Sequence, residues 1–192
     1  MENRKVVRPL IITVGVIVMI VSLSGQRWLT GKVDGNKSNA GLISFEYCTK
    51  KSDVADDGSF VWRMVCSDQS WSYLRNQGRA SFIFTGSGAC VLCFSVFSIA
   101  CFVLFAVLCF LGFHVEKASF HEELNSGFFE IDDKTIRTKF HPVRMAVKVG
   151  ILACLEGAVF IYTAPEGFSA GYGLSALVVG FIISSCGTYK QV

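Results

Sequence analysis

Four stretches of this sequence are long, apolar and almost free of charged residues, and polar segments separate them. An apolar run of about 20 residues is the length that an α-helix needs to cross the ~30 Å hydrocarbon core of a bilayer. The chain of 192 residues is 52% hydrophobic and only 17% charged, which is unusual for a soluble domain. The sequence therefore predicts an integral membrane protein with four transmembrane helices.

The sequence predicts a single domain, residues 1–192, in which spans and loops alternate. The predicted spans cover 7–27, 80–113, 143–163 and 168–186, the loops between them cover 28–79, 114–142 and 164–167, and 187–192 form a tail. The first run also has features of a secretory signal, with basic residues before a short apolar stretch and small residues near Ser24. We expect a retained helix; cleavage would leave three spans and an external C-terminus.

The eight cysteines are unevenly distributed. Six lie inside apolar runs, and only Cys48 and Cys66 lie in polar sequence. This division indicates one disulfide in the 28–79 loop, formed in an oxidising compartment, while the other cysteines act as small apolar side chains. The same loop contains an N-glycosylation sequon at Asn36. Both features predict that this loop is extracellular.

The charged residues favour one orientation in the membrane. The net charge is +3 and the basic residues are scattered, which is not typical of a nucleic-acid-binding protein. Basic residues flank the spans on one side, whereas the 164–167 connection carries only Glu166, as the positive-inside rule expects. We therefore expect a multi-pass plasma-membrane protein with both termini in the cytoplasm. The flanking basic residues are Arg4, Lys5, Arg8, Arg144, Lys148 and Lys190.

Two of the polar loops contain β-strand patterns. Residues 59–66 alternate and are rich in β-formers, so they predict a strand that ends at Cys66, with residues 41–48 as its partner. Residues 128–140 alternate on both sides of Asp132-Asp133-Lys134, which predicts a small hairpin. An isolated two-stranded hairpin is marginally stable, so we expect it to need the membrane or a partner.

The order of several residues resembles a known family. Trp28 follows the first span, Gly41-Leu42 precedes the cysteine pair, and Arg79 opens the second span. Together with the short second outer loop and residues 158–175, this order is similar to the peripheral myelin protein, epithelial membrane protein and claudin superfamily of tetraspan proteins. Ile43 stands where that family has a second Trp, and the inner loop is longer than usual, as in a divergent, claudin-like member.

The resemblance implies a fold and a function. The expected fold is an all-α membrane protein, a four-transmembrane-helix bundle with a small antiparallel extracellular β-sheet, and Trp28 is expected to anchor at the membrane interface. The expected function is that of a structural protein of epithelial cell–cell junctions, contributing to adhesion or a paracellular barrier through the first outer loop. The alternative is an auxiliary subunit of an ion channel or receptor, like the calcium-channel gamma subunits. The implied partners are membrane lipids, other membrane proteins in cis or trans, and a cytoplasmic scaffold bound by the C-terminal Val192.

Glu156 is the one carboxylate inside a predicted span. We interpret it as a polar link between helices, with Thr85, Ser87 or Tyr172 as partners, and the alternative is a transport role. Cys109 and Cys186 lie near cytoplasmic helix ends and are candidates for palmitoylation. The small residues Ala176, Gly180 and Ser184 form a face suited to close helix packing. No catalytic, cofactor-binding or metal-binding constellation is found in the sequence, so we do not expect an enzyme.

Overall fold

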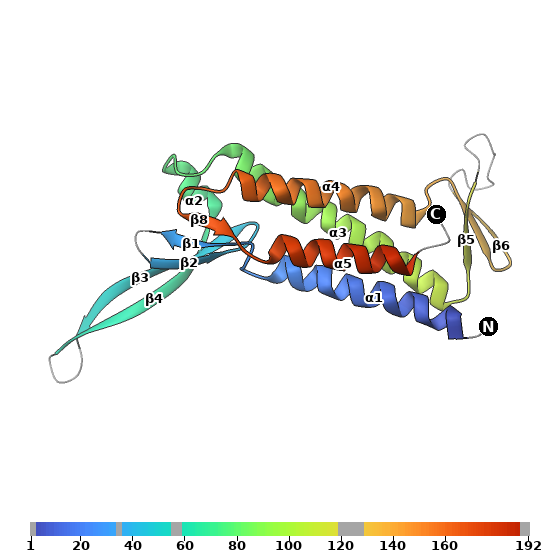
Figure 1. Ribbon diagram of the computed structural model, residues 1–192, viewed down its shortest axis with the longest axis horizontal. Helices are drawn as coiled ribbons and strands as arrows, with labels where there is room; N and C mark the ends of the chain where they lie inside the picture. Colours follow the sequence, from blue (N-terminus) through green and yellow to red (C-terminus); the bar gives the residue numbers. More distant parts are fainter. Residues whose placement is uncertain (1–2, 34–35, 55–58, 119–128, 189–192) are drawn as a thin grey trace. The chain divides into compact units, whose positions relative to one another are not determined.

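The computed structural model describes residues 3–33, 36–54, 59–118 and 129–188. Figure 1 shows the elements in chain order. Five helices lie in these residues: α1 Asn3–Ser24, α2 Trp71–Asn76, α3 Phe82–Phe110, α4 Pro142–Tyr162 and α5 Gly173–Gly187. Eight strands lie there as well: β1 Leu29–Val33, β2 Asn36–Ala40, β3 Ser44–Val54, β4 Phe60–Ser70, β5 His114–Lys117, β6 Phe129–Asp132, β7 Thr135–Thr138 and β8 Phe168–Ala170.

The prediction of an all-α four-helix bundle is wrong. Strands make up 27% of the described residues, and five of them form one antiparallel sheet. The long polar loop satisfies its backbone N–H and C=O groups by strand pairing, and a segment of the fourth apolar run joins the same sheet. Within the described part of the chain, three helices are long and apolar enough to cross a bilayer: Val7–Ser24 of α1, all of α3 and all of α4. The chain is therefore a membrane protein.

The predicted span at 168–186 is also wrong, because its first residues form a strand. β8 pairs with β1, and α5 begins only at Gly173. The N–H groups of Gly171 and Gly173 donate to the carbonyls of Trp28 and Arg27, at 2.8 and 3.2 Å. These bonds keep the backbone extended up to the helix. With 15 residues, α5 is about 22 Å long, which is shorter than the ~30 Å hydrocarbon core.

The chain divides into two compact units, and the first comprises residues 1–21, 93–154 and 175–192. Its core contains side chains of α1, α3, α4 and β5, centred on Phe102 and Phe105. Small residues bring α1 and α5 together in an antiparallel arrangement. A Cβ at Gly15 would overlap the backbone of Gly180 and Ser184. The predicted small-residue face of α5 therefore packs in part against α1.

A three-stranded sheet of order β5-β7-β6 belongs to this first unit. β6 and β7 pair antiparallel, and Asp133 in their turn has a φ of 46°. The hairpin predicted between residues 128 and 140 is confirmed. The sequence did not predict β5, which pairs parallel with β7 and supplies the third strand that an isolated hairpin lacks.

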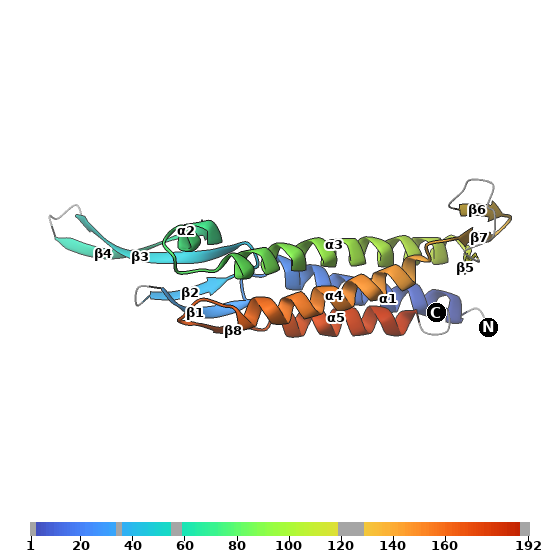
Figure 2. The ribbon, with the colours of Figure 1, turned by 90° about the horizontal axis from the view of Figure 1, so that it is seen from above.

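The second unit comprises residues 22–92 and 155–174. Its five-stranded sheet has the order β4-β3-β2-β1-β8. β2 pairs with β3 only at Ala40 and Phe45, whereas β3 and β4 pair along the whole of both strands, from Ser44↔Ser70 to Val54↔Phe60. Figures 1 and 2 show the consequence, which is that β3 and β4 continue past β1 and β2 as a two-stranded ribbon.

Candidate functional site

An aromatic cluster holds the second unit together. Trp28, Phe45, Trp71, Phe84 and Phe160 are all at most 2% exposed. Trp71 stacks on Phe45 with ring centroids 5.0 Å apart, and Trp28 meets Phe160 edge to face at 6.1 Å. Aromatic pairs of this kind add about 0.5–1.5 kcal/mol each beyond the area they bury. The cluster joins β3 and the residue before β1 to α2, α3 and α4, so the sheet has a packed base.

The predicted role of Trp28 as an interfacial anchor is wrong. The side chain is 0% exposed, and its Nε1–H donates to the carbonyl of Ser22 at 2.8 Å. A Cβ added at Gly173 would lie 2.6 Å from the indole ring, so the start of α5 rests directly on it. Trp28 stands between the end of α1 and the start of β1, and the returning chain covers it.

The Gly41-Leu42 motif supports a tryptophan that lies elsewhere in the sequence. The N–H of Gly41 donates to Ser44, and its carbonyl accepts a 3.1 Å bond from the indole of Trp71. Leu42 is 3% exposed, whereas Ile43 is 60% exposed. The indole packed here therefore comes from Trp71. This role of Trp71 was not predicted from the sequence, although Ser70, which caps α2 by accepting from the N–H of Ser72, could have indicated a helix start.

Two other residues of the 28–79 loop were predicted to matter, Arg79 as part of the family motif and Asn36 as a glycosylation site. Arg79 follows α2, donates its N–H to Leu74 at 2.9 Å, and lines a cavity of about 570 Å³ together with Glu166. Asn36 is the first residue of β2. Its glycosylation stays a prediction.

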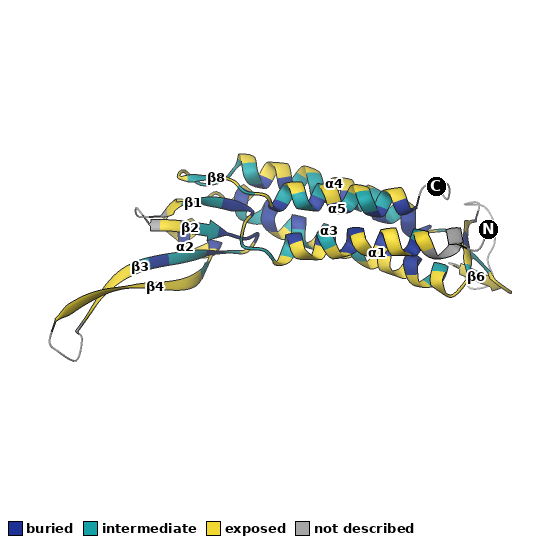
Figure 3. Cartoon of the chain, turned by 60° about the horizontal axis from the view of Figure 1, so that its bottom comes forward, coloured by how far each residue is buried: buried dark blue, intermediate teal, exposed yellow. Residues whose placement is uncertain are grey.

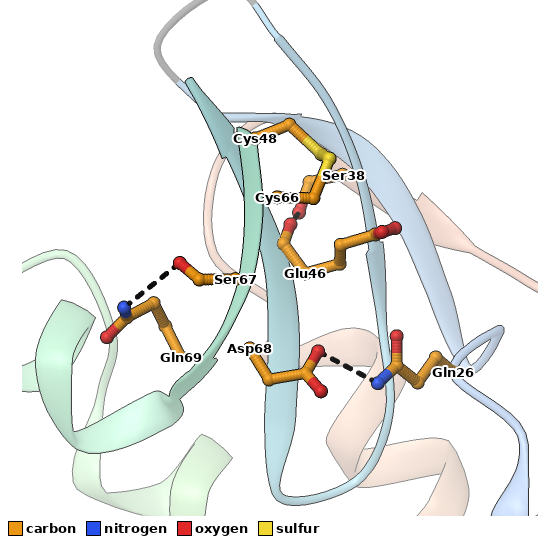
Figure 4. The surroundings of a disulfide bond; sticks show 8 residues. All are labelled: Gln26, Ser38, Glu46, Cys48, Cys66, Ser67, Asp68 and Gln69. Atoms are coloured by element: carbon orange, nitrogen blue, oxygen red, sulfur yellow. Dashed lines mark hydrogen bonds between the residues drawn. A yellow bond between two sulfur atoms is a disulfide. The ribbon is translucent and has the colours of Figure 1, made fainter. Parts of the chain in front are cut away.

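The structure contains the disulfide between Cys48 and Cys66. The two residues lie directly opposite each other on β3 and β4, as Figure 4 shows. Because the bridge joins residues 18 positions apart, it stabilises the folded hairpin by about 3 kcal/mol in the chain-entropy account. It therefore stands at the base of the two-stranded ribbon and fixes its register.

Side-chain hydrogen bonds surround this disulfide (Figure 4). The Ser38 hydroxyl donates to the carbonyl of Glu46, which ties β2 to β3. Gln26 donates from Nε2 to Asp68 at 3.0 Å, which ties the segment after α1 to β4. A Glu46 oxygen also lies within 4.8 Å of both cysteine sulfurs, but sulfurs bonded to each other offer no thiolate to a metal ion.

Three large apolar side chains on one face of β4 project into solvent. Phe60, Trp62 and Met64 are 75%, 68% and 56% exposed. Alternate residues of a strand face the same way, so these three form one row, here called the apolar stripe. Figure 3 shows that β4 is exposed along its length. Large exposed apolar groups in a contiguous row are typical of a surface that contacts another molecule.

The backbone of β4 is also accessible to another molecule. β4 is an edge strand whose one neighbour is β3, and no strand in the described residues pairs with its outer side. An edge strand presents N–H and C=O groups to which another chain can bind. Its other face carries an exposed ion pair between Arg63 and Asp53, 3.9 Å apart, which contributes at most about 1 kcal/mol. The ribbon thus leaves the outer edge of the five-stranded sheet exposed at β4.

Glu156 lies half-buried on α4. Among the residues that the structure describes, it has no hydrogen-bond or ion-pair partner, so the predicted link to Thr85, Ser87 or Tyr172 is wrong. The Thr85 hydroxyl instead donates to the carbonyl of Phe82 within α3, at 3.0 Å. Tyr172 lies 53% exposed beside the Arg27 guanidinium. Within that part of the chain, the Glu156 carboxyl on a candidate span is therefore unpaired.

The two predicted palmitoylation sites differ in accessibility. Cys109 is half-buried and packs against the core of the first unit, whereas Cys186 is exposed in the last turn of α5. Cys186 is the better candidate for acylation, which requires an accessible thiol. The C-terminal Val192 lies outside the described residues.

No protein-family model matches this sequence, and no curated protein matches it either.

Proposed function

We propose that this protein acts at cell–cell contacts, where its disulfide-linked sheet binds a protein of the same or of the apposed plasma membrane. The observation that carries the proposal is the apolar stripe on the edge strand β4. Exposed aromatic residues of this kind are the common anchors of protein interfaces, and an edge strand offers main-chain hydrogen bonds beside them.

Two further features support an extracellular position for the sheet. Disulfides persist in oxidising compartments, and the Cys48–Cys66 bridge belongs to the same unit as the stripe. Basic residues lie at the starts of α1 and α4, which the positive-inside rule assigns to the cytoplasm. The order of Trp28, Gly41-Leu42, the cysteines and Arg79 resembles the claudin superfamily, and this resemblance supports a role in epithelial adhesion or a paracellular barrier.

The test is the position of the tagged full-length protein in confluent epithelial cells. The double variant Phe60→Ser/Trp62→Ser removes most of the stripe from an exposed surface, so folding is retained. The matched control, Ile43→Ser/Tyr73→Ser, removes two side chains of the same unit that are 60% and 43% exposed and lie outside β4.

We expect the wild type and the control to concentrate at cell borders and the stripe variant to spread evenly over the surface at equal surface abundance. Uniform staining of the wild type, or equal enrichment of all three proteins, would contradict the proposal.

A second function is favoured by Glu156 alone. A carboxyl group on a candidate span without a partner among the described residues would be stabilised by a polar group of another membrane protein. This arrangement suits an auxiliary subunit of a channel or receptor.

Purification of the tagged chain in mild detergent separates the two functions. A channel or receptor in stoichiometric amount with the wild type, and its loss with Glu156→Gln, would establish the auxiliary role and overturn the contact proposal. Thr163→Val, a change of similar size directly after α4, is the control that should leave the partner bound.

A further inference from the structure

A cavity of about 460 Å³ lies in the first unit where the three-stranded sheet meets the start of α4. Figure 2 shows β5, β6 and β7 beside that end of the helix. Its lining includes Lys117 of β5, Lys139 after β7, and Arg144 and Lys148, one helical turn apart on α4. The volume is within the usual range of small-molecule sites, and four cations surround it.

The acidic residues of the sheet do not neutralise these cations. Glu116 and Glu130 are the cross-strand neighbours of Arg137 on either side, so three charges of mixed sign occupy one face. Adjacent strand residues point to opposite faces, so Lys117 faces away from Glu116. Within the described residues, Lys117, Lys139, Arg144 and Lys148 form no ion pair. Four like charges around one cavity repel each other and are stabilised by a bound anion.

His141 adds a polar group to the same cavity. It is 4% exposed, lines the cavity, and holds Nε2 at 3.3 Å from the carbonyl of Val115. Its Nδ1 atom is buried and has no hydrogen-bond partner among the described residues. His141 also precedes the first turn of α4, where backbone N–H groups lack intrahelical acceptors and the helix dipole favours an anion.

The apolar part of the lining indicates what kind of anion fits. Phe140, 61% exposed, and Met145 line the cavity beside the cations. α4 is a candidate span from Pro142 onward, so the cavity lies at the end of a segment that enters the bilayer. An amphiphile can place its charged group among the lysines and its acyl chain along α4. A free phosphate ion would leave the apolar side uncovered.

We propose that this cavity binds the phosphorylated headgroup of an anionic phospholipid, with Lys117, Lys139, Arg144 and Lys148 as its cationic ligands. Basic pockets at the membrane surface bind phosphoinositide-type headgroups in this way. The bound lipid neutralises the cluster and connects the three-stranded sheet to the start of the span.

Native mass spectrometry of the full-length chain in detergent tests the proposal. The probes are short-chain phosphatidylinositol phosphate, phosphatidylcholine of the same chain length, and inorganic phosphate. The variant Arg144→Gln/Lys148→Gln changes two exposed side chains, and we expect it to weaken phosphatidylinositol phosphate binding by about 30-fold. The control Lys134→Gln/Arg137→Gln also removes two positive charges, but from the part of the three-stranded sheet that does not line the cavity. It should bind phosphatidylinositol phosphate as the wild type does.

Three results would overturn the proposal. An equal loss of phosphatidylinositol phosphate binding in both double variants would mean that the lipid is attracted non-specifically to the basic residues of the protein. Equal binding of phosphatidylcholine, whose headgroup has no net charge, would mean that the net negative charge of the lipid headgroup is not recognised. Binding of inorganic phosphate alone, without the lipid, would mean a soluble anion site.

Discussion

Trp28 is the residue on which three segments of the second unit converge. Its indole donates to Ser22 at the end of α1, its carbonyl accepts from Gly171, and its ring supports Gly173 at the start of α5. The same contacts explain why residues 168–172 are not helical, because their backbone is bound to that of residues 27–31. The packing of one residue thus decides where the last helix begins.

Gly173→Ala should destabilise the protein by about 1–3 kcal/mol, the usual cost of overpacking. The added Cβ would lie 2.6–2.7 Å from the Trp28 ring, which is 0% exposed and has no room to move. The control is Gly86→Ala on α3, where a Cβ meets nothing within 4 Å and should be neutral or stabilising. Thermal unfolding in detergent measures both. Equal midpoints for the two variants would contradict the assigned packing.

His141 should make the stability of the first unit depend on pH. Burial, and to a smaller extent the charge of Arg144, lower its pKa from 6.5, although its hydrogen bond to Val115 acts in the opposite direction. A histidine with a lowered folded pKa binds more protons when unfolded. The contribution of neutral His141 to the free energy of unfolding is therefore fully present above about pH 6.5. Below that pH it falls by at most about 1.4 kcal/mol per pH unit.

Unfolding by denaturant in detergent at a series of pH values between 7.5 and 5 measures this dependence. His141→Gln, which keeps a donor for the Val115 carbonyl, should remove the part of the slope that belongs to this residue. An identical pH dependence in the variant would show that other groups are responsible.

At the scale of elements, the β3–β4 ribbon depends on the disulfide. Beyond Cys48 and Cys66, the two strands have no further strand beside them in the described sheet, and a two-stranded ribbon alone is marginally stable. Cys48→Ser/Cys66→Ser should therefore cost about 3 kcal/mol and act mainly on this ribbon. Hydrogen–deuterium exchange should rise in residues 48–66 and stay unchanged in α3 and α4. Unchanged exchange in the ribbon would contradict this account.

The elements that could be predicted from sequence are those with local signals. Asp133 in a turn between alternating residues indicates β6 and β7, and the two cysteines in polar sequence indicate their own disulfide. β5 and β8 have no such signal, because a strand of three or four residues is defined by the distant strand with which it pairs. The burial of a side chain can likewise depend on residues that are distant in the sequence. Trp28 follows an apolar run, as an interfacial anchor would, and its burial depends on residues more than 100 positions away.

At the scale of the whole molecule, the three candidate spans determine which segments share a side of the membrane. α1, α3 and α4 follow one another along the chain, so a chain that crosses the bilayer at all three would have residues 25–81 on one side and residues 111–141 on the other. The disulfide lies in the first of these segments, and the basic cavity is lined by the second segment together with the first turns of α4. We therefore propose that the five-stranded sheet is extracellular and that the lipid site faces the cytoplasmic leaflet, whose lipids are anionic.

Cysteine labelling of intact cells checks this arrangement. A membrane-impermeant maleimide should label Tyr73→Cys, at an exposed position of α2, without permeabilisation. It should label Lys134→Cys, in the β6–β7 turn, only after permeabilisation. The wild type gives the background from the six free cysteines. Labelling of Lys134→Cys on intact cells would reverse the orientation. It would also place the apolar stripe inside the cell, where it could not serve a contact between cells.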